Sequence, residues 1–429
     1  MRHAPRLRRI MGDNGVTFDN SFVTNSLCCP SRATSLRGQY AHNHGIRQNS
    51  APLGGWPKFS RLGREQTTIA TWLQAGGYQT FFLGKYLNNY EHTYVPPGWD
   101  EWYGWMGFYD TSRNQSDQYR INHNGQVLSF DPEQTHDTDL LAARASEYIR
   151  QAATDPSPFF LYLSLNAPHQ PAPSAVGYRH RFRDSRQPRT AAFNEADVSD
   201  KPAWVRRKPL LDDSQIARVD AVYRRRLRSM LSVEDAVATL ISALEDTGRL
   251  DNTYLVFTSD NGHHNGHRRQ MPQKMTAYDE DIRVPLLVRG PGVPAGVRRR
   301  HLVVNNDVAP TIADLAGVDT PAFVDGRSFE RLLHPDPPAS RRWRKAFVVE
   351  KWGDAIAPPY RALRTRNYLF VRYPGGEREL YGLRADPHQV DAIAPGRTRR
   401  RLSRRFMPRL DAIKVCAGQQ CRTEENVAP

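Results

Sequence analysis

Short apolar runs alternate with helix-like segments along the first three quarters of the chain. The runs have the length of buried strands and cover residues 78–83, 159–165, 254–258 and 284–288. Segments with apolar residues at helical spacing cover residues 67–77, 137–153, about 220–250 and 305–317. Continuous apolar strands that alternate with helices predict an α/β fold, with a mostly parallel sheet covered by helices on both faces.

The pattern changes near residue 338. Four short strand-like runs, residues 346–350, 361–365, 368–373 and 379–383, are separated by turns and predict a small antiparallel sheet. We therefore divide the chain into a catalytic α/β domain, residues 1–337, and a C-terminal α+β subdomain with a basic tail, residues 338–429. Residues 171–213 are rich in Pro, Arg and Ser without a period, which predicts a long excursion over the surface.

Polar residues follow three of the predicted strands. Lys85 follows the first strand, His169 follows the second, and Asp260 and Asn261 follow the third. Ligands of α/β proteins bind beyond the carboxyl ends of the strands. The three strand ends therefore predict one shared site.

The most specific segment is CCPSRATSLRG, residues 28–38. A helix that begins at Cys28 points free N–H groups and its positive end at an anion. An ordinary buried thiol is the alternative, and no catalytic Cys-His pair is evident nearby. The segment resembles the signature of the formylglycine-dependent sulfatases, C-x-P-S-R followed by a helix and Leu-x-Gly. The resemblance implies that a formylglycine-generating enzyme oxidises Cys28, and not Cys29, to formylglycine.

Further segments extend the resemblance over nearly the whole chain. They are GYQTFFLGKYLNNY, TSDNGHHNGH, YDEDIRVPLLVRGPG and ELYGLRADPHQ, in the order found in the family. GKYLNNY and IRVPLLVRGPG look most like the branch of N-acetylglucosamine-6-sulfatases and heparan endosulfatases. The family belongs to the alkaline-phosphatase superfamily, so the resemblance implies the α/β fold predicted above.

The resemblance also implies roles for the polar residues. Arg32 would brace the modified side chain at position 28. Lys85, His169 and Lys274 match residues that contact sulfate in the family, and His264 matches a histidine near the oxygen of the leaving group. Cys28, Arg32, His169 and His264 are thus the predicted catalytic residues. Taken alone, each histidine or lysine is as well explained by packing or by a solvated surface.

The resemblance implies a calcium site. Asp260 and Asn261 match one pair of metal ligands, with the modified Cys28 beside them, and a carboxylate and an amide oxygen suit a hard cation. The family begins with an apolar strand that ends in two aspartates, which complete the site. No Asp-Asp pair precedes Cys28 in this sequence. We therefore expect an N-terminally truncated chain with a weakened metal site and an unpaired strand edge.

Composition narrows the remaining possibilities. The chain of 429 residues has a net charge of +15, concentrated in arginine runs such as residues 298–300, 341–345 and 397–405. We interpret these runs as solvated surface charge, because no nucleic-acid-binding motif accompanies them. No apolar stretch is long enough to span a bilayer, and the basic N-terminus lacks the apolar core of a signal peptide. Cys416 and Cys421 have the spacing of a small disulfide loop, which favours an extracytoplasmic full-length form, and two unpaired thiols are the alternative.

The sequence therefore predicts a hydrolase of sulfate esters, with 6-sulfated N-acetylglucosamine, a related sulfated glycan or an aryl sulfate as substrate. Two alternatives stay open. One is a phosphoesterase of the same superfamily, and the other is an inactive, truncated glycan-binding remnant. We expect neither nucleic acid nor a membrane span among its partners.

Overall fold

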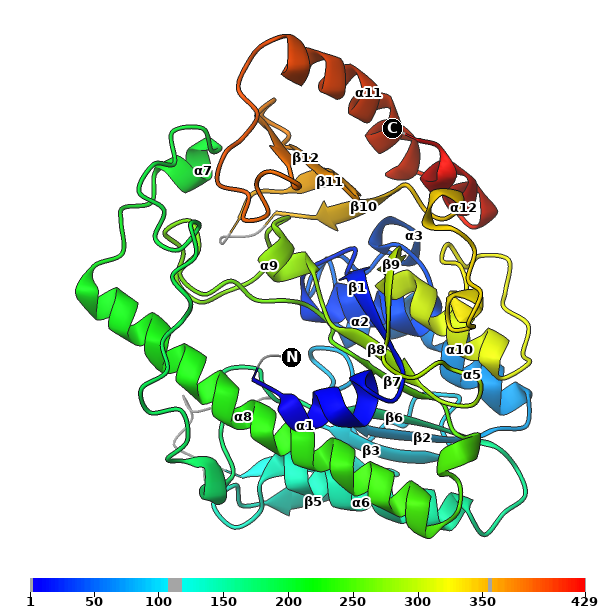
Figure 1. The fold of residues 1–429 in the computed structure, drawn as a ribbon. Helices are drawn as coiled ribbons and strands as arrows, with labels where there is room; N and C mark the ends of the chain where they lie inside the picture. The colour runs from blue at the N-terminus through cyan, green and yellow to red at the C-terminus, as the bar shows by residue number, and fades with distance from the viewer. Residues whose placement is uncertain (1–2, 107–117, 354–356, 429) are drawn as a thin grey trace.

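A computed structural model of the chain describes residues 3–106, 118–353 and 357–428. Figure 1 shows two sheets in the lower part of the molecule, with helices around them, and a third sheet above, covered by a helix. This arrangement confirms the α/β fold class and the small C-terminal antiparallel sheet. The short helices of the α/β part are α1 (Pro5–Leu7), α3 (Ala41–His44), α4 (Trp56–Arg61), α7 (Ala203–Arg206) and α9 (Asp279–Ile282).

The first sheet has the strand order β7-β8-β1-β9. Its strands are β1 (Val16–Phe22), β7 (Leu255–Thr258), β8 (Leu286–Arg289) and β9 (Val297–Val304). β1 pairs parallel with β9 and antiparallel with β8, and β8 pairs antiparallel with β7. The sequence predicted β7 and β8 but not β1 or β9, because polar residues interrupt the apolar pattern of these two strands.

The second sheet has the strand order β5-β4-β3-β2-β6. Its strands are β2 (Gln79–Gly84), β3 (Glu101–Trp105), β4 (Tyr119–His123), β5 (Gln126–Phe130) and β6 (Phe159–Ser164). β2 pairs parallel with both β3 and β6, whereas β4 and β5 form an antiparallel hairpin at one edge. The predicted single sheet is thus divided in two, and among the described residues β6 and β7 each pair with one strand only.

Helices cover both faces of the second sheet, as the continuous apolar strands predicted. Phe81 and Leu83 of β2 face α6 (Asp137–Ala152), while Phe82 faces the opposite side. That opposite side is covered by α2 (Cys28–Arg37), α5 (Ile69–Ala75) and α10 (Val308–Leu315). The long helix α8 (Asp213–Asp246) packs on α6 (Figure 1). Alternate residues of a strand point to opposite faces, so a run of apolar residues is buried on both sides.

The C-terminal part is an antiparallel sheet of β10 (Ala346–Lys351), β11 (Tyr360–Thr365), β12 (Tyr368–Arg372) and β13 (Arg378–Gly382). One face shares a core with the α/β part, where Phe22 packs with Phe347 and Val349. α11 (Arg397–Ile413) covers the other face and is followed by α12 (Gln419–Asn426). The sequence predicted the strands to within one residue at either end, but gave no helix for α11, since arginines dominate that segment.

A buried ionic network joins the two parts of the chain. The guanidinium of Arg344, which is 2 % exposed, forms ion pairs with Asp307 and Glu425. Glu425 also pairs with Arg327 at 2.8 Å and accepts a hydrogen bond from the hydroxyl of Tyr40. The network therefore ties α12 to residues of the α/β part.

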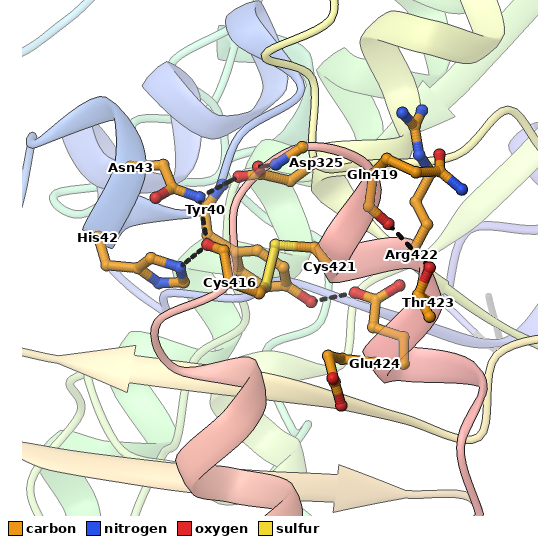
Figure 2. Close-up of a disulfide and its surroundings, with 12 residues drawn as sticks. Tyr40, His42, Asn43, Asp325, Cys416, Gln419, Cys421, Arg422, Thr423 and Glu424 are labelled. Carbon is orange, nitrogen blue, oxygen red and sulfur yellow. Dashed lines mark hydrogen bonds between the residues drawn. A yellow bond between two sulfur atoms is a disulfide. The ribbon is translucent and has the colours of Figure 1, made fainter.

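The predicted disulfide between Cys416 and Cys421 is present and connects the end of α11 to α12 (Figure 2). The carbonyl oxygen of Cys416 accepts a hydrogen bond from Asn43 Nδ2 at 2.8 Å and lies 3.0 Å from His42 Nε2. Asn43 Nδ2 also donates to Asp325 Oδ2 at 2.8 Å. The disulfide loop is thus bonded to α3, directly after the helix that carries Cys28.

Candidate active site

The first turn of α2 presents Cys28 at the helix N-terminus. Leu27, in an extended conformation, precedes the helix, and α2 ends at Gly38, whose φ is 65°. A Cβ atom at Gly38 would lie 2.8 Å from a side-chain carbon of Val324, so both the conformation and the packing require glycine. The helix therefore begins where the signature segment predicted, with its positive end at Cys28.

Arg32 joins the three strand ends that the sequence placed in one site. Its Nε donates to Asp260 Oδ2 at 2.7 Å, after β7. Its Nη1 donates to the carbonyl oxygen of Lys85 at 2.6 Å, after β2, and to Ser164 Oγ at 2.5 Å, at the end of β6. Arg32 therefore holds the strand ends together from the helix, one turn after Cys28.

Two ammonium groups and an imidazole converge on Cys28. Its Sγ lies 2.7 Å from Lys274 Nζ and 3.3 Å from Lys85 Nζ, and His169 forms a side-chain hydrogen bond with it. Lys274 Nζ also donates to Asn261 Oδ1 at 3.1 Å. Seven of the eight residues that the sequence singled out therefore form one constellation around the Sγ atom of Cys28.

The charges of the constellation suit an anion. Burial alone would raise the pKa of the Cys28 thiol, but Lys274 and Lys85 outweigh burial and hold it well below its ordinary value. Burial opposes ionisation of Asp260 as well, yet Arg32 and Lys85 hold its pKa far below the usual range. The cationic side chains of Arg32, Lys85 and Lys274 surround the single carboxylate of Asp260. The excess positive charge can stabilise a bound oxyanion.

The eighth predicted residue, His264, lies behind the constellation. Its Nδ1 is 2.9 Å from Asp281 Oδ2, and its backbone pairs with Gln273, which precedes Lys274. The Nε2 atom is buried and has no hydrogen-bond partner among the described residues. In this arrangement His264 supports the segment that carries Lys274, and no hydrogen bond joins it to Cys28 within the described residues.

Two further residues of the site were missed by the sequence analysis. Arg226 of α8 donates to the carbonyl oxygen of Pro168, and burial lowers its pKa to about 10. His263 lies 3.4 Å from Gln170, and burial together with Arg226 lowers its pKa. Arg226 belongs to an arginine run on an amphipathic helix, so no local signal separated it from surface charge. His263 adjoins His264, and the adjacent pair was the available signal.

The donor groups fit part of a metal site. Asp260 and Asn261 offer a carboxylate and an amide oxygen, which are ligands of hard cations such as Ca²⁺. Calcium takes about six to eight oxygen ligands, so these two residues would supply only some of them. Asp260 and Asn261 would hold the ion beside Cys28, where Lys274 and Arg32 now bond their oxygens.

Unconverted Cys28 is expected to react selectively with iodoacetamide. The thiolate is the reactive form, and Lys274 and Lys85 lower the pKa of the buried Cys28 thiol, so alkylation of Cys28 should persist to lower pH than that of an ordinary thiol. Burial raises the pKa of Cys29 to about 12, so this thiol should stay protonated and unmodified. Peptide mass spectrometry over a pH series measures both. Lys274→Ala should move the Cys28 profile to higher pH, and equal alkylation of both cysteines would contradict the assignment.

Comparison with known proteins agrees with this geometry. The family model "Sulfatase" matches residues 1–318, and the model "N-sulphoglucosamine sulphohydrolase, C-terminal" matches residues 268–415. Human N-acetylglucosamine-6-sulfatase is 32% identical, with 97% of this chain covering 82% of that protein. A Sulf-1 extracellular sulfatase homologue of Caenorhabditis elegans is 36% identical over 82% of this chain, and the chain spans half the length of that relative.

Solved structures share the fold. A protein in complex with its substrate D-glucosamine-2-N,6-O-disulfate superposes with a TM-score of 0.81 at 23% identity, over 99% of this chain and 94% of that one. The phosphonate monoester hydrolase of Agrobacterium radiobacter gives a TM-score of 0.74 at 20% identity, over 96% and 90% of the two chains. The family model covers most of the chain, and the signature residue Cys28 lies beside Lys274 and Lys85, near the ion pair of Arg32 with Asp260. The chain therefore belongs to the sulfatase family.

Proposed function

We propose that this protein is a sulfuric ester hydrolase that acts on 6-sulfated N-acetylglucosamine or a related sulfated glycan, with formylglycine derived from Cys28. The observation that carries the proposal is the convergence of Lys274 and Lys85 on Cys28 Sγ at the start of α2. The similarity to N-acetylglucosamine-6-sulfatases supports the substrate class. A formylglycine-generating enzyme is the partner that such a site requires.

Formylglycine at position 28 would supply a hydrated aldehyde, with one hydroxyl as the nucleophile and a second hydroxyl to assist the release of sulfate. Lys274 and Lys85 lie on either side of this position and balance the negative charge that grows on the sulfate oxygens. Arg32 keeps Asp260 ionised, and its hydrogen bonds connect α2 to the ends of the three strands. We assign to His169 the donation of a proton to the leaving alcohol, which its hydrogen bond to the side chain at position 28 supports.

A bound divalent cation would add Lewis-acid polarisation of the sulfate. Calcium is our proposal for this ion, because Asp260 and Asn261 are oxygen ligands. The extracellular relatives and the disulfide support an extracytoplasmic location for a full-length form. Within the described residues, no helix has both the length and the apolar character to cross a bilayer.

The proposal is tested by sulfate release. The chain is co-expressed with a formylglycine-generating enzyme, conversion at Cys28 is measured by peptide mass spectrometry, and sulfate release from N-acetylglucosamine 6-sulfate is followed with and without Ca²⁺. We expect turnover that a chelator suppresses and that Ca²⁺ restores. Converted protein that releases no sulfate under any of these conditions would contradict the proposal and favour a glycan-binding remnant.

The structural similarity to a phosphonate monoester hydrolase favours a phosphoesterase as second candidate. The same converted protein is therefore assayed with a phosphate monoester and a phosphonate monoester of matched leaving group. Faster hydrolysis of either phosphorus ester than of the sulfate ester would favour this candidate.

Lys274→Ala is expected to lower kcat/KM for the sulfate ester by about a hundredfold or more, because one preplaced charge beside the reacting group is lost. The side chain is 8 % exposed and has polar partners only, so we expect little change in the free energy of unfolding. Lys58→Ala, which removes a charge outside the site, is the matched control. Wild-type turnover in Lys274→Ala would remove this lysine from the mechanism.

A further inference from the structure

A row of arginines lies on the exposed face of α11. Five of them are exposed to solvent: Arg397, Arg400, Arg401, Arg404 and Arg405. Their spacing of i, i+3, i+4, i+7 and i+8 places them on one side of the helix, over a length of about 12 Å. We refer to these five residues as the arginine face of α11. Figure 1 shows α11 along the outer edge of the C-terminal sheet, with one side open.

The orientation of this face is fixed by the opposite side of the helix. Leu402, Phe406, Leu410 and Ile413 are buried against the C-terminal sheet, where they pack with residues of β10 and β11. Because these apolar residues recur at helical spacing, the helix cannot rotate without exposing them. The arginine face therefore points outward in the folded protein.

Four of the five arginines on this face have no acidic partner among the described residues. Asp411 is the only acidic residue of α11, and it pairs with Arg372 and Lys414. No salt bridge within the described part of the chain joins an acidic side chain to four members of the face, namely Arg397, Arg400, Arg401 and Arg404. Like charges at this spacing repel, and cations at a helix N-terminus oppose the helix dipole. An external polyanion would relieve both effects.

A charged cleft adjoins the first turn of α11, next to the side of the helix that faces the C-terminal sheet. It is lined by Arg206, Arg378 and Arg399, together with Asp200 and Glu377. Arg399 belongs to α11, and its Nη2 donates to the carbonyl oxygen of Arg378 at 2.7 Å. Since Glu377 pairs with Arg206, the other two guanidinium groups add positive charge at this end of the face. The row itself extends over a length of about 12 Å, which favours an extended ligand over a single ion.

We propose that the arginine face of α11, with the adjoining cleft, is a docking surface for a sulfated polysaccharide chain, separate from the residues around Cys28. Guanidinium groups bind oxyanions through two parallel hydrogen bonds, and every basic residue of α11 is an arginine. A membrane surface is disfavoured, because the apolar residues of α11 are buried and cannot enter lipid. The choice of a sulfated chain over nucleic acid rests on the proposed function.

The surface is tested by the combined variant Arg397→Gln, Arg400→Gln, Arg401→Gln and Arg404→Gln, because glutamine keeps the helix propensity and removes the charge. Binding of a heparin-derived dodecasaccharide is measured by surface plasmon resonance between 0.1 and 0.4 M NaCl, on the full chain. We expect affinity to fall about tenfold or more at the lowest salt, with a shallower dependence on salt.

The matched control replaces four exposed arginines outside α11, namely Arg300, Arg331, Arg341 and Arg342, by glutamine. This variant loses the same net charge, so equal weakening in both variants would overturn the proposal in favour of a general effect of charge. A 20-base-pair DNA duplex and phosphatidylserine vesicles serve as competing probes. If the α11 variant lost affinity only for the DNA duplex or only for the vesicles, and not for the dodecasaccharide, the proposed docking surface would also be overturned.

The binding assay requires no turnover, so its outcome is separable from that of the proposed function. Sulfate release from the monosulfated sugar should be unchanged in the α11 variant, because this small substrate does not reach the arginine face. If the wild-type protein releases no sulfate but its dodecasaccharide binding is weakened in the α11 variant, only the proposed function is contradicted. If the protein releases sulfate normally and the α11 variant binds the dodecasaccharide as tightly as wild type, only the docking surface is contradicted.

Discussion

Replacement of Cys28 by alanine is expected to abolish sulfate release from the converted protein. The substitution removes the nucleophile, and loss of a nucleophile typically costs a factor of about a thousand or more in kcat. Lys274 and Lys85 would retain their positions, so weak binding of sulfate is expected to persist. The measurement compares initial rates of sulfate release for wild type and variant at equal concentrations of folded protein.

Cys29→Ala is the matched control, since the two cysteines are adjacent and both are buried. Cys29 packs in the hydrophobic core with residues of α5 and β2, and its thiol is not among the groups that bond Cys28. The loss of one buried sulfur is expected to cost about 1 kcal/mol of stability and to leave substantial activity. Equal loss of activity in both variants would sink the assignment of Cys28 as the modified residue.

Arg344→Met is expected to give the largest loss of stability. The variant leaves the buried carboxylate of Asp307 without its guanidinium partner and leaves Glu425 with Arg327 alone, and the loss of a buried ion-pair partner costs about 3–5 kcal/mol. The network connects α12 to the α/β part, so the variant should also loosen α12. Urea unfolding followed by circular dichroism measures the loss, and hydrogen exchange reports on α12.

Arg341→Met, an exposed position three residues earlier, is the control and should change stability by less than about 0.5 kcal/mol. Adding Asp307→Asn to Arg344→Met removes the carboxylate charge that has lost its partner and should recover part of the loss. A single Arg344→Met variant within about 1 kcal/mol of wild type would contradict the importance of the network.

Much of the fold could be predicted because the apolar patterns that indicate its strands lie within short segments of the sequence. The strands β2, β6 and β7 are short continuous apolar runs, and their positions were predicted to within one residue at either end. β1 and β9 carry polar residues within the strand, so their apolar pattern is interrupted and neither was predicted. α11 was missed for a related reason, because its four buried apolar residues are separated by arginines.

The sequence by itself determined the fold class and the helix that begins at the signature cysteines, because each depends on the spacing of residues within short segments. The structure decided that Cys416 and Cys421 are bonded, since their spacing allowed two free thiols as well. Only the tertiary structure decided which groups meet. Lys274 reaches Cys28 across 246 positions of sequence, and Arg226 enters the site from a helix that looked like solvated surface. The contact of His264 with Asp281 likewise joins residues that are 17 positions apart in the sequence. Such contacts depend on how distant strands and helices pack, and no local pattern records that packing.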